Sequence, residues 1–263
     1  MSAFKGRIAI VTGAGSGVGR ATALRLASEG AKVVALGRTA SKVEETIRLM
    51  RDAGGDGQAL ALDVSAEDAS ERAISETLAA YGRLDVLVNN AAVGRDYENT
   101  KPGSMRPVTE TTKALWREVV EIDLNAAAFM AAAALPALIE SGAGAIVNVA
   151  SVFGLRGSDT DHAYSAAKGG LINLTRSLAI TYGASNVRAN CVAPGLVDTE
   201  MAADIINTGF LQHPKHRFQA SALGRAGKPD EIAAVIVFLA SDDAAFVTGA
   251  VVVADGGLSA RVS

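Results

Sequence analysis

A tyrosine and a lysine four residues apart, Tyr164 and Lys168, are the side chains of this sequence best suited to acid–base chemistry. At this spacing on a helix, two side chains project from the same face and can approach each other. A free tyrosine has a pKa of about 10 and is a poor base at neutral pH. A neighbouring ammonium stabilises the phenolate, and lowering the pKa by about three units requires about 4 kcal/mol. The pair therefore predicts a phenol that serves as a general acid or base.

Ser151 lies thirteen residues before Tyr164 and ends the apolar segment 145–151. In a sheet of parallel strands, ligands bind at this end of the strands. A hydroxyl placed there can hold a substrate oxygen and orient it against Tyr164. A Tyr-x-x-x-Lys pair alone is common on helix surfaces, and a lone serine can simply cap a strand. The three residues together indicate a catalytic site.

A glycine-rich turn follows the first apolar segment and leads directly into a predicted helix. Such a turn places backbone N–H groups and a helix N-terminus where a pyrophosphate can bind. Glycine at three positions removes side chains that would block this approach. The turn predicts a phosphate-binding site formed by Gly13, Ser16, Gly17, Val18 and Gly19.

The second apolar segment ends in Gly37 and Arg38. In dinucleotide sites an acidic residue at this point binds the ribose 2′-hydroxyl of NAD, whereas the 2′-phosphate of NADP needs a cation. Arg38 supplies a guanidinium that can bind a phosphate. A solvated charge at a strand end is the alternative interpretation, and neither residue excludes NAD. The sequence therefore favours NADP(H) over NAD(H).

These residues lie in a chain that alternates short apolar segments with longer amphipathic ones. Nearly continuous apolar segments are typical of parallel strands covered on both faces, and strand–helix–strand repeats imply right-handed crossovers. The pattern predicts an α/β fold: a Rossmann-type doubly wound parallel sheet of about seven strands, with helices on both faces. The predicted strands are 7–11, 32–36, 58–62, 85–88, 145–149, 187–192 and 250–253. The predicted helices are 18–28, 41–52, 66–81, 112–140, 164–182 and 229–240.

Two segments interrupt this alternation, at 94–111 and 200–227. Long loops at the carboxyl ends of strands often shape or cover a ligand site. For segment 94–111, an ordinary surface loop without a role in ligand binding is an equal alternative. Segment 200–227 is predicted to be a substrate lid. No linker divides the chain, so residues 1–263 are predicted to form a single domain.

Composition excludes several classes of function. A net charge of −3 provides no basic field for nucleic acid or an anionic membrane. The segment 126–139 is too short to span a bilayer and is expected to be a buried helix. The single cysteine, Cys191, rules out an intramolecular disulfide, and a cytoplasmic location is expected. No cluster of residues has metal-ligand spacing, so no metal is expected.

Six motifs, in order and suitably spaced, resemble those of the short-chain dehydrogenase/reductase family in its compact single-domain branch. The resemblance runs from about residue 5 to 258. It implies a soluble oxidoreductase that interconverts a secondary alcohol and a ketone with NAD(P)(H), acting on a small-molecule substrate. The motifs are Thr12–Gly19, Asn89-Asn90-Ala91, Ser151, Tyr164-x-x-x-Lys168, Pro194-Gly195 and Asp255-Gly256-Gly257.

The resemblance also assigns cofactor contacts. It implies that Asp63 and Val64 hold the adenine, that Asn89 and Ala91 line the ribose side, and that Lys168 bonds the nicotinamide ribose beside Tyr164. The segment that begins at Pro194 and Gly195 resembles the family's carboxamide clamp, formed by Val197 and Thr199.

One family residue is replaced. The family places an asparagine in the long middle helix, where it supports a water that relays protons from the lysine. Spacing from Trp116 and Pro136 puts Asp123 at that position, while Asn125 requires a local shift of the alignment. Asp123 is therefore taken as the fourth catalytic residue, and its charge is expected to perturb Lys168.

The alternative function is a catalytically silent, cofactor-binding regulator or scaffold with the same fold. Ser151, Tyr164 and Lys168 argue against it, and Asp123 is its one support. By resemblance, helices 112–140 and 164–182 pair across a two-fold interface. The alanines of the first helix permit close packing, so a homotetramer or homodimer is expected.

Overall fold

A seven-stranded parallel sheet forms the centre of the computed structural model, which describes residues 3–208 and 221–260. Its strand order is β3-β2-β1-β4-β5-β6-β7, and neighbouring strands are parallel throughout. The chain reverses its direction of travel across the sheet between β1 and β4, which creates the switch point where such folds bind ligands. The strands are β1 (Ile8–Thr12), β2 (Lys32–Gly37), β3 (Asp56–Ala61), β4 (Val86–Asn89), β5 (Gly144–Val149), β6 (Val187–Pro194) and β7 (Val251–Ala254). The predicted doubly wound fold is confirmed, with strand ends displaced by at most two residues.

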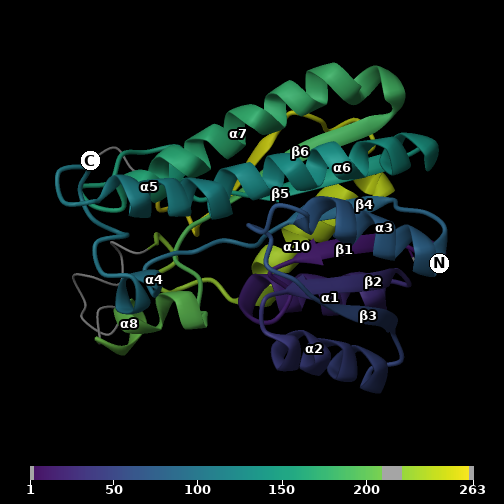
Figure 1. The fold of residues 1–263 in the computed structure, drawn as a ribbon, viewed down its shortest axis with the longest axis horizontal. Coiled ribbons are helices and arrows are strands. Elements are labelled where there is room, and N and C mark those ends of the chain that lie inside the picture. Colours follow the sequence, from purple (N-terminus) through teal and green to yellow (C-terminus); the bar gives the residue numbers. More distant parts are fainter. Residues whose placement is uncertain (1–2, 209–220, 261–263) are drawn as a thin grey trace.

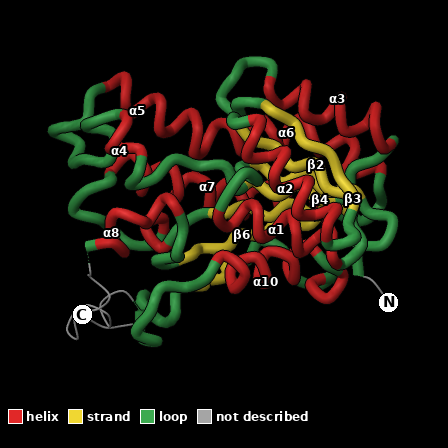
Figure 2. The backbone as a smooth tube through the Cα atoms, turned by 90° about the horizontal axis from the view of Figure 1, so that it is seen from below, coloured by secondary structure: helices red, strands yellow, loops and turns green. Residues whose placement is uncertain are grey.

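Helices cover both faces of the sheet, which explains why the strands are apolar throughout (Figure 1). Along β1, Ala9 and Val11 pack against one layer of helices and Ile10 against the other, because successive side chains point to opposite faces. The first layer contains α1 (Gly17–Ser28), α2 (Ala40–Asp52) and α10 (Pro229–Ala240). The second contains α3 (Ala69–Tyr81), α6 (Ala126–Glu140) and α7 (His162–Tyr182). Figure 2 shows the strands enclosed between these helices.

The predicted helix 112–140 is continuous but not regular. It consists of α5 (Lys113–Val120), a π-helical turn (Glu121–Asn125) and α6. A π-turn holds one more residue than an α-turn, and such turns are frequent at functional sites. The segment 126–139 was predicted to be too short to span a bilayer. The helix that contains it, Lys113–Glu140, is long and apolar enough to cross a membrane by length and composition. In this structure α6 packs against α3 with eight of its fifteen residues buried, so the helix predicted to be buried is only partly so.

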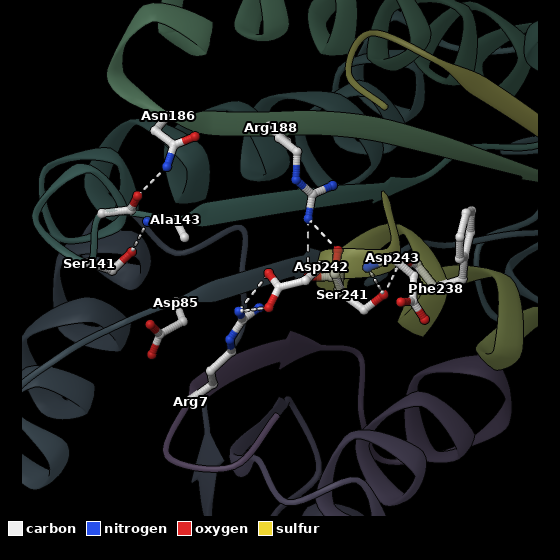
Figure 3. Close-up of polar contacts among 12 residues, drawn as sticks. Arg7, Asp85, Ser141, Ala143, Asn186, Arg188, Phe238, Ser241, Asp242 and Asp243 are labelled. Carbon is white, nitrogen blue, oxygen red and sulfur yellow. Dashed lines mark hydrogen bonds and ion pairs between the residues drawn. The ribbon is translucent and has the colours of Figure 1, made fainter. Parts of the chain in front are cut away.

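The amino-terminal edge of the sheet is closed by ionic and polar contacts (Figure 3). Arg7, just before β1, pairs with Asp242 at 2.6 Å. Arg188 of β6 donates to the carbonyl of Ser241 at 2.8 Å, at the end of α10. Asp85 accepts from the backbone N–H of Ile8 at 2.8 Å. These contacts fix the strand starts, and the residues predicted to be functional lie toward the opposite edge.

Helix α3 begins three residues later than predicted, at Ala69 rather than residue 66. Ser65 lies just before the predicted start, and its backbone N–H and hydroxyl both donate to Asp63 Oδ1, at 3.0 and 2.7 Å. This local bond stabilises a turn and removes Ser65 from the helix start.

The two long segments contain short helices that sequence did not predict. Segment 94–111 includes α4 (Tyr97–Thr100), and the proposed lid includes a 3₁₀ turn (Glu200–Ala202) and α8 (Ala203–Asn207). Residues 209–220 of the lid, with both of its histidines, lie outside the described residues. Further 3₁₀ turns are Val152–Gly154, Gly183–Ser185 and Asp242–Ala244.

Candidate active site

The glycine-rich turn leaves no room for side chains at its centre. A Cβ on Gly19 would overlap the carbonyl oxygen of Gly13, and one on Gly13 would lie 2.9 Å from the Cα of Ala91. Gly13 also has a φ of 65°, which favours glycine. Ser16 precedes α1 in an extended conformation and makes no side-chain capping bond, and the first turn carries no acid. The uncapped helix start is suited to an anion.

Thr12 and Asn90 fix the end of β4 beside this turn. Thr12 Oγ1 accepts from the backbone N–H groups of Asn90 and Ala91, both at 2.9 Å. The Asn90 side chain donates back to the carbonyl of Thr12 at 2.9 Å. Both residues belong to motifs of the sequence, but their mutual role was not predictable, because only the pairing of β1 with β4 brings them together.

Asn89 is bonded into the sheet through its amide nitrogen. Nδ2 donates to Asn148 Oδ1 at 2.9 Å and to the carbonyl of Ala127 at 3.2 Å. Its side-chain oxygen is buried and has no hydrogen-bond partner among the described residues. Both amide hydrogens are therefore used within the protein, and the oxygen is the side-chain atom left to accept a further bond.

The segment after β6 returns to the phosphate turn. Gly195 packs tightly on the chain after β7, where a Cβ would lie 2.8 Å from that of Asp255. Val197 then pairs with Gly227 in an isolated bridge. The methyl group of Thr199 lies 3.1 Å from the place of a Cβ on Gly17. The structure thus brings Thr199, at the end of the segment that begins with Pro194, Gly195 and Val197, beside the predicted phosphate site.

The predicted adenosine end lies at the ends of β2 and β3. Gly37 is close to the phosphate turn, since a Cβ there would be 3.8 Å from the backbone nitrogen of Gly15. Arg38 is exposed and forms no ion pair within residues 3–208 and 221–260. Asp63 and Val64 are partly buried, and Asp63 is held by its bonds from Ser65.

Ser151, Tyr164 and Lys168 meet at the carboxyl end of β5. Ser151 is 8% exposed and its hydroxyl hydrogen-bonds the Tyr164 side chain. The Lys168 side chain is 2% exposed, and its Nζ lies 5.5 Å from the centre of the Tyr164 ring. It donates to the carbonyl of Val149 at 3.2 Å. The ring of Phe153 packs edge-on against Tyr164 at 6.4 Å.

The π-helical turn directs Asp123, and not Asn125, toward this cluster. Asp123 Oδ1 accepts from the backbone N–H of Val93 at 2.8 Å, and its Oδ2 lies 3.7 Å from Lys168 Nζ. The separation is that of an ion pair and is too long for a good hydrogen bond. Asn125 instead donates to Glu121 at 2.7 Å. The spacing-based choice of Asp123 therefore matches its position beside the lysine.

The electrostatics of Tyr164 differ from the sequence-based expectation. Lys168 was expected to lower its pKa, but the pKa of Tyr164 is raised, first by burial and then by the negative charge of Asp123. The hydrogen bond from Ser151 opposes this shift, and the carboxylate of Asp161 adds to it. Burial also raises the pKa of Asp123, to about 6, against the attraction of Lys168. The expected lowering of the pKa is therefore not found for the protein groups alone, because burial of the phenol dominates and Asp123 adds to it.

A second buried carboxylate lies three residues before Tyr164. The Asp161 side chain is 4% exposed, and its Oδ2 accepts from Arg95 at 2.8 Å and from Thr160 at 2.8 Å. Asp161 has a φ of 53°, a left-handed conformation that is uncommon outside glycine. The sequence did not reveal this pair, because Arg95 and Asp161 belong to different loops.

A cavity of about 870 Å³ lies elsewhere, between α3 and α6. Ile74 and Leu78 of α3 face Phe129 of α6 across it, and Val64 lies at its border. The cavity is not lined by any residue of the cluster formed by Ser151, Tyr164, Lys168 and Asp123. The buried titratable side chains converge instead at the Tyr164 cluster.

A glycine-rich turn at the switch point, with a serine, tyrosine and lysine at the end of a nearby strand, is the arrangement of a nicotinamide-dependent oxidoreductase. Comparison with known proteins agrees. A family model described as Enoyl-(Acyl carrier protein) reductase matches residues 13–259. The chain is 42% identical over 262 residues to cis-4-hydroxycyclohexanecarboxylate dehydrogenase of Sinomonas cyclohexanicum, covering 98% of each protein.

Two solved structures have the same fold. A crystal structure of levodione reductase has a TM-score of 0.89 at 35% identity, covering 98% of this chain and 100% of the other. A putative NAD(P) dependent gluconate 5-dehydrogenase from Beutenbergia cavernae, with bound NADP, has a TM-score of 0.88 at 36% identity, covering 98% and 99%. The chain belongs to the short-chain dehydrogenase/reductase family, and it is an oxidoreductase acting on CH–OH and C=O groups.

Proposed function

We propose that this protein interconverts a secondary alcohol and a ketone with NADP(H), and that Tyr164 donates or accepts the proton. The observation that carries the proposal is the convergence of Ser151, Tyr164 and Lys168 at the carboxyl end of β5, near the switch point. In this proposal the Ser151 hydroxyl holds the substrate oxygen. Tyr164 exchanges a proton with that oxygen, and Asp123 holds Lys168 in place.

The residues present fit a dinucleotide. The start of α1 has no side-chain cap, the turn has no space for a Cβ at Gly19, and the buried Asn89 oxygen has no partner in the described part of the chain. NADP(H) supplies the hydride or accepts it when bound. Lys168 and Tyr164 would contact its nicotinamide ribose. The other residues proposed to hold it are Gly13, Ser16, Gly17, Val18, Gly19, Arg38, Asp63, Val64, Asn89, Ala91, Pro194, Gly195, Val197 and Thr199.

Preference for NADP(H) is supported by two neighbouring residues. Gly37 carries no carboxylate to repel a 2′-phosphate, and Arg38 offers an exposed guanidinium without an ion pair among the described residues. A guanidinium binds phosphate well because its planar donors match the phosphate oxygens. One structural relative contains bound NADP, which is compatible with this proposal.

The proposed substrate is a small-molecule alcohol or ketone. The names of two relatives, a hydroxycyclohexanecarboxylate dehydrogenase and levodione reductase, support a compound of that kind. We propose that residues 200–227 act as its lid on a single domain of residues 1–263. The Glu200 carboxylate is already paired with Lys42 of α2 at 2.6 Å, so this segment contacts the cofactor-binding half.

The test is steady-state oxidation of NADPH and NADH by the purified protein over a varied panel of ketones. The proposal expects turnover with at least one ketone, and a higher kcat/KM with NADPH than with NADH. Binding of NADPH without consumption over the whole panel would contradict it, and would instead favour a catalytically silent scaffold.

We also propose a homotetramer, or a homodimer, assembled through α6 and α7 in the cytoplasm. Phe129 of α6 and Ile180 of α7 support an interface there, because their side chains are 55% and 85% exposed and large exposed apolar side chains often mark contact surfaces. Small-angle scattering gives the mass directly. A mass of two or four chains is expected, and a mass of one chain would refute the assembly.

A further inference from the structure

Charged and polar groups from several elements surround the phenol of Tyr164. Asp123 comes from the π-helical turn, Lys168 from α7 and Asp161 from the chain before α7. Ser151, at the end of β5, is the neutral group that bonds the phenol. Arg95, from the loop after β4, reaches the same region through its bond to Asp161. The protonation of Tyr164 depends on how these charges offset each other.

Asp161 has an ion-pair partner of its own. Its Oδ2 accepts hydrogen bonds from Arg95 and from Thr160, both at 2.8 Å, and Arg95 also donates to the Thr160 hydroxyl at 2.9 Å. A charge-assisted bond of this length is a strong one. The Asp161 carboxylate still raises the pKa of Tyr164, but its effect is smaller than that of Asp123.

Asp123 has no such partner of its own. Its side chain is 0% exposed, and within residues 3–208 and 221–260 the one cation paired with it is Lys168 at 3.7 Å. Its Oδ2 accepts no hydrogen bond from the described residues. Lys168 is in turn held between Asp123 and the carbonyl of Val149. Lys168, which would attract a phenolate, and Asp123, which would repel it, thus form one buried ion pair.

We propose that Asp123 is a positioning residue that offsets the positive field of Lys168 at Tyr164, keeps the phenol protonated, and so favours carbonyl reduction over alcohol oxidation near neutral pH. In reduction, the phenol O–H bond breaks as the substrate oxygen gains the proton, with NADPH supplying the hydride. The phenolate is then reprotonated from solvent. Oxidation needs the phenolate first, and therefore begins only where the phenol ionises.

The pKa directions agree with this geometry. Asp123 raises the pKa of Tyr164, and the pKa of Asp123 itself, about 6, makes it an anion at neutral pH. An asparagine at this position would carry no charge and would leave the ammonium of Lys168 uncompensated. The inference rests on the proposed function, because it concerns the direction of the same reaction.

The experiment compares the wild type with Asp123→Asn and with the matched control Asp161→Asn. Asparagine keeps an oxygen for the N–H of Val93, so the substitution removes mainly charge. The rate of alcohol oxidation is measured from neutral to alkaline pH. In Asp123→Asn the apparent pKa of the rising limb falls by about one pH unit or more, with a smaller shift in Asp161→Asn. The proposal is overturned if the apparent pKa of the rising limb is unchanged or higher in Asp123→Asn. An equal shift in both variants overturns it as well.

A second readout does not need turnover. Ultraviolet difference titration detects phenolate, and subtraction of the Tyr164→Phe curve isolates Tyr164. A titration that shifts down in Asp123→Asn without any turnover supports the inference and contradicts the proposed function. Turnover with an unshifted titration of Tyr164 supports the proposed function and contradicts the inference.

Arg95→Met provides a further variant should Asp123→Asn not fold. Methionine leaves Asp161 without its cation, so the titration of Tyr164 moves to higher pH. If that titration instead stays in place or moves down, buried carboxylates do not control this phenol and the inference fails.

Discussion

Asp123 Oδ2 lies 3.7 Å from Lys168 Nζ, and the two side chains are 0% and 2% exposed. A buried ion pair of this kind does not by itself stabilise a fold, because desolvating two charges can cost more than their attraction returns. Its position beside Tyr164 points to a role in the chemistry. The relationship also makes the stability of the protein depend on pH in a defined direction.

The first prediction concerns that pH dependence. The pKa of Asp123 is about 6 in the folded protein and about 3.9 when unfolded. Between these values the folded state binds a proton that the unfolded state does not, so the contribution of Asp123 to stability falls as pH rises. The unfolding free energy of the wild type, relative to Asp123→Asn, should drop by about 2 to 3 kcal/mol over this window and then level off.

Urea denaturation of both proteins at several pH values from about 4 to about 7 measures the difference. Comparing the two proteins cancels the titration of all other groups. If the unfolding free energy of the wild type instead rises relative to that of Asp123→Asn as pH rises, the fold stabilises the ionised Asp123 carboxylate, and this account is contradicted.

The second prediction tests the close approach in the phosphate turn. In Gly19→Ala the new Cβ would overlap the carbonyl oxygen of Gly13, so the turn must move. We expect a loss of stability of about 1 to 3 kcal/mol and markedly weaker NADPH binding. Gly183→Ala is the control, because a Cβ there meets nothing within 4 Å. Equal NADPH affinity in both variants would rule out the turn as the phosphate site.

The third prediction concerns the choice of cofactor. Arg38→Gln removes the guanidinium proposed to bind the 2′-phosphate, and should weaken NADPH binding about tenfold or more while changing NADH binding little. Fluorescence titration with each cofactor measures this ratio. Arg48→Gln, on the same side of the sheet but paired with Glu45 and Asp52, should leave the ratio unchanged. A parallel loss for both cofactors in Arg38→Gln would argue against a phosphate contact.

Much of the fold could be predicted because it depends on local pattern. The apolar segments that become β1 and β5 are buried on both faces, and continuous hydrophobicity is what such strands require. The i, i+4 spacing of Tyr164 and Lys168 was equally local, since a helix alone places them on one face.

The features that sequence missed depend on contacts between distant segments. The π-helical turn at Glu121–Asn125 leaves the apolar pattern of its helix almost unchanged, so periodicity did not reveal it. The Arg95–Asp161 pair joins residues 66 positions apart, and the raised pKa of Tyr164 results from burial in the assembled site. Spacing showed which side chains can meet, whereas their net electrostatic effect required the structure.

The most direct test of the account is the Tyr164→Phe variant, assayed with NADPH and a ketone that the wild type reduces. The substitution removes one hydroxyl and keeps the ring against Phe153, so NADPH affinity should stay close to that of the wild type. Turnover should fall by at least about a hundredfold, the usual contribution of a general acid. If Tyr164→Phe binds NADPH normally and reduces the ketone at a rate close to the wild type, Tyr164 is not the proton donor and the proposed chemistry is wrong.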